Sequence, residues 1–243
     1  MKILVLSPIL RRERTGEEET SLSRELNKKY QKFLGSDVEI ERKGLDIGAA
    51  NIETFFDEYI AGPDLMKKGM EAEKEGFDAI VLGCAGDPLI EGLREALEIP
   101  VVGPMEASLH LACILGHRFT WLTPAKYMVP RKLKAIEAAG LRDRLASIRD
   151  LGLSVAELHE DPDITIGRII KESKEAIERD GAEVIILGCL GMTEFAEEVS
   201  KKMDVPVIEP LSVGLKLAES LVRLGLRHSR ITYPKPREKK RRF

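Results

Sequence analysis

Short runs of apolar and β-branched residues alternate along the chain with longer segments in which apolar side chains return every three to four positions. The short runs predict buried strands of parallel sheets, and the longer segments predict the amphipathic helices that connect them. The expected helices cover residues 53–75, 88–97, 107–115, 126–139, 164–179, 194–203 and 213–224. This alternation favours an α/β fold with mainly parallel sheets.

Three landmarks occur twice in the same order, which indicates an internal repeat. A strand that ends in a hydroxyl followed by a proline is expected at Ser7 and again at Thr123. The pattern G-x-[DE]-x-I-[VI]-L-G-C-x-G occupies residues 76–86 and 181–191. The third landmark is a short strand between two prolines, at 99–104 and 205–210.

The repeat predicts two pseudo-symmetric lobes, each a mainly parallel sheet flanked by helices, with the active site at their interface. The first lobe is expected to cover residues 1–103 and to be completed by a helix within 210–230. The second lobe is expected at 104–209, and a basic tail at 231–243.

Each copy of the second landmark places a cysteine, Cys84 or Cys189, directly after a buried strand. Ligands of parallel sheets bind at the carboxyl ends of the strands, and the turn after each cysteine is predicted to open a helix. Asp87 and Thr193 are the expected N-caps of these two helices, with Pro88 at the first helical position. A helix N-terminus lowers the pKa of a thiol and stabilises a negatively charged oxygen.

Two such thiols can act as a base on one face of a carbon and as an acid on the opposite face, which is racemisation without a cofactor. A lone cysteine at a strand end is more often a packed core residue, but the matched positions favour catalysis. Cys113, in the middle of a predicted helix, is expected in the core, and His117 and His228 are expected to be surface or capping groups. Neither a metal-binding histidine pattern nor a phosphate-binding glycine motif occurs in the sequence, so no metal or nucleotide is expected.

Other residues at the same strand ends are candidates for binding substrate or orienting the thiols. Asp87 and Glu209 are the candidate carboxylates, although a helix cap explains Asp87 and a solvated strand end explains Glu209 equally well. Turn hydroxyls before proline are the alternative explanation for Ser7 and Thr123. The substrate-binding candidates are Ser7, Asn51, Ala85, Gly86, Thr123, Leu190 and Gly191.

The composition limits the class of protein. With 43% hydrophobic residues and a formal net charge of −3, a globular protein is expected. The tail at 235–243 contains six basic residues and one acidic residue, which leaves an acidic body, so a nucleic-acid partner is not expected. The start of the chain lacks a secretory leader pattern, no run is long enough to cross a membrane, and the cysteines show no disulfide pattern, so a cytoplasmic protein with reduced thiols is expected. Few side-chain amides and many charged residues are typical of heat-adapted proteins.

On these motifs the chain resembles the aspartate/glutamate/hydantoin racemase superfamily, and within it the hydantoin racemase branch. The resemblance extends over about residues 1–235 and is carried by residues 84–88, 100–103, 106–107, 115–119, 181–192, 205–209 and 217–219. It implies a two-lobed α/β fold in which Cys84 and Cys189 are the two proton-transferring cysteines, one for each substrate enantiomer. It also implies an enzyme without pyridoxal phosphate or metal, acting on 5-substituted hydantoins. Such a ring suits a thiolate base because its C5 anion delocalises onto a carbonyl, whereas a free amino acid must place a second negative charge beside its carboxylate.

Two segments depart from the hydantoin racemase pattern. The family carries Asn-Pro-Asn-Ser/Thr after the first strand, whereas this chain has Ser7-Pro8-Ile9-Leu10. A family stretch Gly-Pro-x-Ser-Ile-Glu corresponds here to residues 48–53, with Asn51 as the polar side chain. The apolar Ile9 and Leu10 favour a bulkier or less polar substrate.

Three functions therefore remain open from the sequence. The first is a racemase or epimerase that inverts a 5-substituted hydantoin. The second is another enzyme of the superfamily, such as an aspartate/glutamate-type racemase or a maleate-isomerase-like enzyme. The third is a small-molecule-binding protein without turnover. A homo-oligomer is expected from base rates alone.

Overall fold

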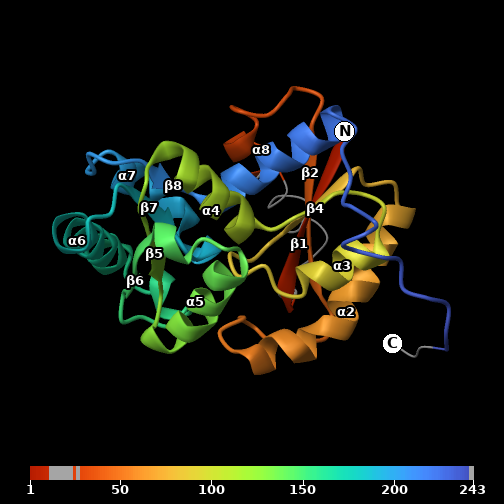
Figure 1. The fold of residues 1–243 in the computed structure, drawn as a ribbon, viewed down its shortest axis with the longest axis horizontal. Coiled ribbons are helices and arrows are strands. Elements are labelled where there is room, and N and C mark those ends of the chain that lie inside the picture. Colours follow the sequence, from red (N-terminus) through yellow and green to blue (C-terminus); the bar gives the residue numbers. More distant parts are fainter. Residues whose placement is uncertain (11–23, 26–27, 241–243) are drawn as a thin grey trace. The chain divides into compact units, whose positions relative to one another are not determined.

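The computed structural model describes residues 1–10, 24–25 and 28–240 of the chain (Figure 1). The last three residues of the predicted basic tail lie outside these ranges. The chain divides into two compact units, one formed by Met1–Gly103 with Gly214–Phe243 and the other by Pro104–Val213. Each unit is an α/β layer structure with one parallel sheet.

The sheet of the first unit has the strand order β2-β1-β3-β4, with every neighbouring pair parallel. Its elements are β1 (Lys2–Leu10), β2 (Glu39–Leu45), α2 (Phe55–Lys74), β3 (Ala79–Leu82), α3 (Ile90–Ala96), β4 (Val101–Val102) and the part of α8 (Pro210–Arg223) from Gly214 onward. Leu4 and Leu6 of β1 pack with Leu65 of α2 and Leu93 of α3 in one buried cluster. These two helices therefore cover one face of the sheet.

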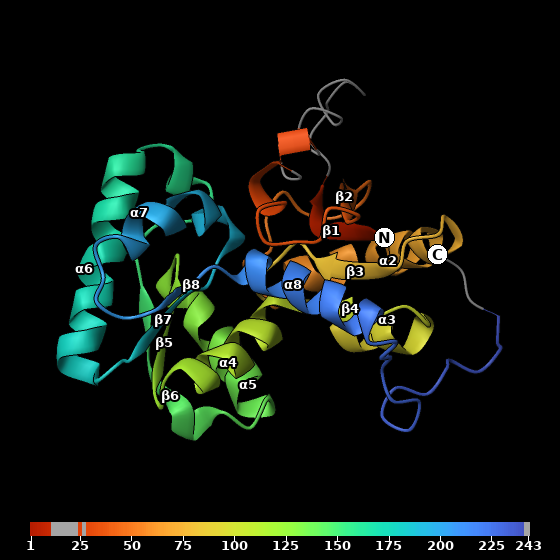
Figure 2. The same ribbon diagram turned by 90° about the horizontal axis from the view of Figure 1, so that it is seen from above.

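The second unit repeats this order as β6-β5-β7-β8, again with parallel pairs throughout. Its strands are β5 (Phe119–Thr123), β6 (Leu145–Asp150), β7 (Val184–Leu187) and β8 (Val207–Ile208). Its α-helices are α4 (Pro104–Leu115), α5 (Val129–Ala138), α6 (Pro162–Asp180) and α7 (Ala196–Ser200). Short 3-10 helices are η1 (Lys126–Met128), η2 (Arg142–Arg144), η3 (Glu157–His159) and η4 (Leu190–Phe195). In Figures 1 and 2, α6 and α7 lie on one face of this sheet and α4 and α5 on the other.

The predicted fold class is confirmed, since two four-stranded parallel sheets flanked by helices follow from the alternating pattern. Three local expectations were wrong. Strand β1 does not end at Ser7-Pro8 but continues to Leu10, because Leu10 pairs with Leu45 of β2 after a register shift. The segment 126–139 begins as the 3-10 helix η1, and 194–203 divides into part of η4 and the short helix α7.

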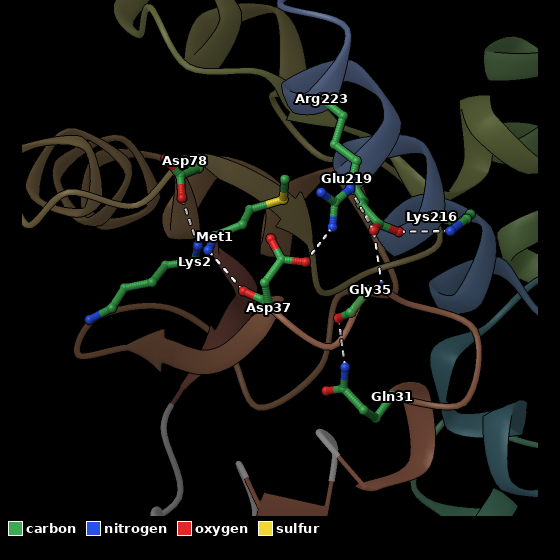
Figure 3. Close-up of polar contacts among 9 residues, drawn as sticks. All are labelled: Met1, Lys2, Gln31, Gly35, Asp37, Asp78, Lys216, Glu219 and Arg223. Atoms are coloured by element: carbon green, nitrogen blue, oxygen red, sulfur yellow. Dashed lines mark hydrogen bonds and ion pairs between the residues drawn. The ribbon is translucent and has the colours of Figure 1, made fainter.

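Helix α8 is tied to the start of the chain by a buried carboxylate (Figure 3). The Glu219 side chain is 4% exposed and accepts hydrogen bonds from the Gly35 backbone N–H at 3.0 Å and from Lys216 and Arg223 at 2.8 and 2.9 Å. Arg223 also pairs with Asp37 at 2.6 Å, and the Asp37 carbonyl accepts a hydrogen bond from the Met1 amino group. The glutamate at the end of the 217–219 motif thus has a structural role.

Replacing Glu219 with Gln is expected to lower the free energy of unfolding by about 2 kcal/mol at neutral pH. Burial alone would raise the pKa of Glu219, but the hydrogen bonds from Lys216, Arg223 and Gly35 outweigh it and hold the pKa below its usual value. A carboxylate with a lowered pKa stabilises the fold above its unfolded pKa of about 4.3, and this stabilisation disappears as the pH falls through the folded pKa. Urea unfolding followed by circular dichroism should therefore show a difference between the two proteins that shrinks below pH about 4.

The matched control is Glu178→Gln, because Glu178 is an exposed glutamate on α6. This variant is expected to change the free energy of unfolding by less than about 0.5 kcal/mol. An equal loss in both variants would mean that the buried network contributes nothing specific.

Among the described residues, no helix is both long enough and apolar enough to cross a membrane.

Candidate active site

The structure places Cys84 and Cys189 at matching points of the two sheets. Each follows the strand that pairs with the first strand of its unit on one side and with the last strand on the other, β3 for Cys84 and β7 for Cys189. Both side chains are partly buried and pack against the hydrophobic cluster of their own unit. Each thiol thus lies at the carboxyl end of a central parallel strand, where ligands of such sheets bind.

The glycine before each cysteine is required by close approach of the neighbouring strand. A Cβ on Gly83 would lie 2.8 Å from the Ser7 Cα, at the carboxyl half of β1. A Cβ on Gly188 would overlap the carbonyl oxygen of Leu122 and the indole of Trp121 in β5. The repeated Gly-Cys pair is therefore one structural device, in which the glycine lets two strand ends converge beside the sulfur.

The surroundings of Cys189 differ from the predicted cap. Thr193 is not the N-cap but lies inside η4, and Cys189 itself occupies the N-cap position. The Gly191 backbone N–H donates to the Cys189 sulfur at 3.4 Å. The local backbone explains why Cys189 takes the cap position. A cysteine in extended conformation directly before a 3-10 turn presents its sulfur to the first free N–H groups of that turn. An N–H donor at this distance stabilises the thiolate over the thiol.

The loop after Cys84 also departs from the expected cap. Helix α3 begins at Ile90 with Leu89 as its N-cap residue and no side-chain cap, so neither Asp87 nor Pro88 has the predicted role. Asp87 and Leu89 adopt positive φ angles of 46° and 55°, a conformation that costs about 1 kcal/mol or more for such residues. The Leu89 N–H donates to Glu58 at 3.1 Å, which helps to hold the loop.

A carboxylate lies at the end of the last strand in both units, but it comes from different elements. In the first unit the Asp87 carboxylate fills the space that a Cβ on Gly103 would need, just after β4. In the second unit Glu209 itself follows β8 and accepts hydrogen bonds from the Thr193 hydroxyl and the Leu211 N–H, both at 2.9 Å, and from Ser212. Glu209 is thus hydrogen-bonded to the first turn of α8 and to η4. These hydrogen bonds rule out the alternative explanation that Glu209 is a solvated strand end.

The two first-strand hydroxyls are buried and differ in their contacts. The Ser7 side chain accepts a hydrogen bond from the Arg42 guanidinium at 3.1 Å. The Thr123 side chain is fully buried, and its hydroxyl has no hydrogen-bond partner among the described residues. Thr123 therefore presents an unsatisfied polar group at the carboxyl end of β5.

The remaining predicted substrate contacts lie in the expected loops. Asn51 is partly buried in the segment before α2. Ala85 is buried, whereas Gly86, Leu190 and Gly191 are partly exposed beside the two cysteines. The first unit therefore contains Ser7, Asn51, Cys84, Ala85, Gly86 and Asp87, and the second contains Thr123, Cys189, Leu190, Gly191 and Glu209.

A residue that the sequence analysis did not single out lies near Cys189. His159 of η3 places Nδ1 2.8 Å from Glu194 Oε1, and its ring packs on Phe195 of η4 with centroids 6.0 Å apart. Its Nε2 and the Cys189 sulfur both lie 3.5 Å from the position of a Cβ on Gly191. No sequence pattern links this histidine to the cysteine motif, because the two come from separate segments.

The other cysteine and two further histidines lie on elements outside the repeated cysteine motif. Cys113 is partly exposed on α4, which corrects the expectation that it lies in the core. His117 is exposed, and the His228 Nε2 accepts the Val101 backbone N–H at 2.8 Å. Within the described residues, no group of three or more histidine, cysteine or carboxylate side chains is arranged to hold a metal ion.

Comparison with protein families and curated proteins places the chain among known enzymes. The family model for Asp/Glu/Hydantoin racemases matches residues 20–218. A hydantoin racemase of Pseudomonas sp. strain NS671 is 37% identical over 84% of this chain and 82% of its own length. A hydantoin racemase of Paenarthrobacter aurescens is 34% identical over 98% of this chain and 99% of its own length.

Two solved structures of racemases also match this chain. An allantoin racemase from Pseudomonas fluorescens superposes with a TM-score of 0.89 at 34% identity, covering 100% of both chains. An allantoin racemase from Klebsiella pneumoniae superposes with a TM-score of 0.87 at 26% identity, covering 98% of this chain and 94% of its own.

Proposed function

Because this chain is a racemase of the Asp/Glu/hydantoin racemase family, we propose that it inverts C5 of a 5-substituted hydantoin by proton transfer through Cys84 and Cys189. The observation that carries the proposal is the matched position of the two thiols. Each lies at the carboxyl end of the equivalent central strand, in two sheets of the same order.

Inversion of a carbon acid needs a base on one face and an acid on the other. One cysteine, as the thiolate, removes the C5 proton, and the electron pair left on carbon delocalises onto the adjacent ring carbonyl. The other cysteine, as the thiol, delivers its proton to the opposite face of C5. The reverse reaction exchanges the two roles, so each enantiomer has its own base.

The buried hydroxyls of the two first strands, β1 and β5, support a cyclic amide substrate. Thr123 offers a hydroxyl without a partner among the described residues, and Ser7 is held in place by Arg42. Hydantoin rings carry both N–H donors and carbonyl acceptors, so hydroxyls at these positions can satisfy either kind of group. A hydroxyl donating to the ring carbonyl that receives the charge would lower the barrier by about 3 kcal/mol.

The proposal does not restrict the substituent that the hydantoin ring carries at C5. The relatives are named hydantoin racemases, and the two solved structures are named allantoin racemases. Allantoin is itself a hydantoin with a ureido group at C5, so the same thiol chemistry applies to it. The shared reacting unit is therefore the hydantoin ring, and the substituent decides the rate.

The test measures both exchange and inversion on a panel of single enantiomers. D and L forms of allantoin, a 5-alkylhydantoin and a 5-benzylhydantoin are incubated in deuterated water with the protein, beside aspartate and glutamate. We expect loss of the C5 proton signal by NMR, together with appearance of the opposite enantiomer by chiral chromatography, for one or more hydantoins and for neither amino acid. Turnover of the amino acids alone would reject the hydantoin assignment, and absence of exchange in all compounds would reject the proposed reaction.

A further inference from the structure

The chain that follows α8 returns to the first unit and lies beside α3 and β4 (Figures 1 and 2). We call residues 228–235 the strap. Its side chains bind residues 94–101 through hydrogen bonds, ion pairs and a ring contact. The last residues of a domain are usually poorly ordered unless such contacts tie them down. The strap is therefore a docked element of the first unit rather than a solvated chain end.

Arg230 of the strap binds the end of α3. Its guanidinium donates to the carbonyls of Arg94 and Glu95 at 3.0 and 3.2 Å, and also to the carbonyl of Leu97. The last carbonyls of a helix have no partner within the helix and carry a negative partial charge, so a cation held there is favourable. The strap thus supplies the C-terminal cap of α3.

The strap also covers the outer edge of β4. Among the described residues, no strand pairs with β4 on the side away from β3. The Val101 N–H donates instead to His228 Nε2 at 2.8 Å, and the Val101 carbonyl accepts from Arg94 at 3.1 Å. Tyr233 links these two side chains, since its hydroxyl lies 3.2 Å from Arg94 and its ring meets the imidazole edge-on at 5.7 Å.

The two covered elements border the loop that follows Cys84. This loop leads into α3 at Ile90, and its Asp87 carboxylate lies against Gly103, the residue after β4. The strap therefore holds both neighbours of the Cys84 loop from the outside.

The bond from Val101 determines the charge of His228. A backbone N–H only donates, so Nε2 keeps its lone pair, and the docked ring is neutral with its hydrogen on Nδ1. A protonated ring carries a hydrogen on both nitrogens. It would set one N–H against another and leave the N–H of the buried Val101 without an acceptor.

The charged groups near His228 do not supply a counter-charge for a protonated ring. They are Arg94 and Glu95 on α3, Glu73 on α2, Glu98 in the turn before β4, Arg223 at the end of α8, and Arg227, Arg230 and Lys235 in the chain after α8. Lys235 and Arg230 both pair with Glu98 and hold the pKa of its carboxyl below its usual value. Glu98 is therefore already paired and stays ionised above pH about 5.

We propose that the strap is a pH-operated latch, docked on α3 and β4 while His228 is neutral and released when His228 is protonated. His228 is the single histidine in the sequence of the first unit. Because only the neutral ring accepts the Val101 N–H, docking is complete above the usual histidine pKa of about 6.5 and weakens as the pH falls below it. Between pH 7.5 and 5.5 the ratio of docked to released strap is expected to fall about tenfold.

Amide hydrogen exchange followed by NMR on the full chain measures this ratio directly. The Val101 N–H exchanges when the strap is released, so its protection factor, corrected for the intrinsic effect of pH, is expected to fall about tenfold from pH 7.5 to 5.5. The reference amide is Ile185, which donates to the Pro206 carbonyl at 2.9 Å in the second unit and should keep its protection. Nitrogen chemical shifts of the His228 ring should show the hydrogen on Nδ1 at pH 7.5.

Two substitutions at His228 separate the acceptor from its titration. His228→Gln keeps a neutral acceptor, so Val101 protection should differ by less than about twofold between the two pH values. His228→Phe removes the acceptor, so protection should be about tenfold lower than wild type at pH 7.5 and should not fall further at pH 5.5. His110→Gln is the matched control, since His110 is an exposed histidine of the other unit, and it should behave as wild type.

Wild-type Val101 protection that is equal at both pH values overturns the proposal, as does a pH dependence that persists in His228→Gln. A ring with its hydrogen on Nε2 at pH 7.5 also overturns it. General unfolding in acid would lower the protection of Ile185 together with that of Val101, so a parallel loss at both amides counts against a latch. None of these measurements uses a substrate, so their outcome is independent of the proposed racemisation.

Discussion

Replacing either Cys84 or Cys189 with serine is expected to reduce the racemisation rate of a hydantoin substrate by about a thousandfold. A serine hydroxyl is far less acidic than a thiol, so it neither forms the base nor delivers a proton at a comparable rate. The two variants should fail in different ways. For the enantiomer whose proton faces the remaining cysteine, deuterium is expected to enter C5 with retention of configuration. For the other enantiomer exchange is expected to stop, which NMR with chiral chromatography measures on each form separately.

The third cysteine provides the control for this pair of variants. Cys113 lies on α4, away from the repeated motif, so Cys113→Ser is expected to keep the wild-type rate within about twofold. Full racemisation after replacement of one repeated cysteine would exclude the two-thiol mechanism. It would favour another reaction of the superfamily, such as the maleate-isomerase-like reaction considered from the sequence.

Gly188→Ala is expected to lower the free energy of unfolding of the second unit by about 3 kcal/mol or more. A methyl group at this position would overlap the Leu122 carbonyl and the Trp121 indole, which belong to the adjacent strand β5. Neither group can move away easily, because Trp121 and Leu122 are both fully buried. The chain contains a single tryptophan, so urea unfolding followed by tryptophan fluorescence reports directly on this contact.

Gly167→Ala tests whether the effect is specific to close approach. Gly167 is exposed on α6, and a Cβ there meets nothing within 4 Å. Alanine is favoured over glycine inside a helix, so this variant is expected to be neutral or up to about 1 kcal/mol more stable. A Gly188→Ala protein as stable as wild type would show that β5 and β7 can separate, and it would remove the structural reason for the repeated Gly-Cys pair.

The sequence predicted the fold class and the placement of Cys84 and Cys189 after buried strands. Both predictions depend on patterns that extend over many residues. Continuous apolar runs such as 79–82 and 184–187 require buried parallel strands, and the repeat then fixes equivalent positions in both sheets. The roles of the site residues remain proposals. The order of strands and turns in the sequence also largely predicted which residues share a unit with each cysteine.

Local geometry was less predictable, because tertiary contacts decided it. Asp87 has the right residue type and position for a helix cap, yet its carboxylate packs against Gly103 and its backbone takes a positive φ. Thr193 is likewise a good cap residue, but its hydroxyl donates to Glu209. His159 had no local signal at all, since only the packing of η3 on η4 brings it beside Gly191 in the cysteine motif.

The exchange of a carboxylate between two positions constrains how the halves of the chain have diverged. Asp87 and Gly103 in the first half correspond to Met192 and Glu209 in the second, so each half carries one acidic side chain at this pair of positions. Passing from one arrangement to the other by single changes would create an intermediate with two carboxylates in one place or with none. Both intermediates are unfavourable, the first by like-charge repulsion and the second by loss of a hydrogen-bond acceptor. In related sequences the two positions of each half should therefore covary. A comparison of the two halves should then treat the two positions as one pair, because a change at either one alone is unfavourable.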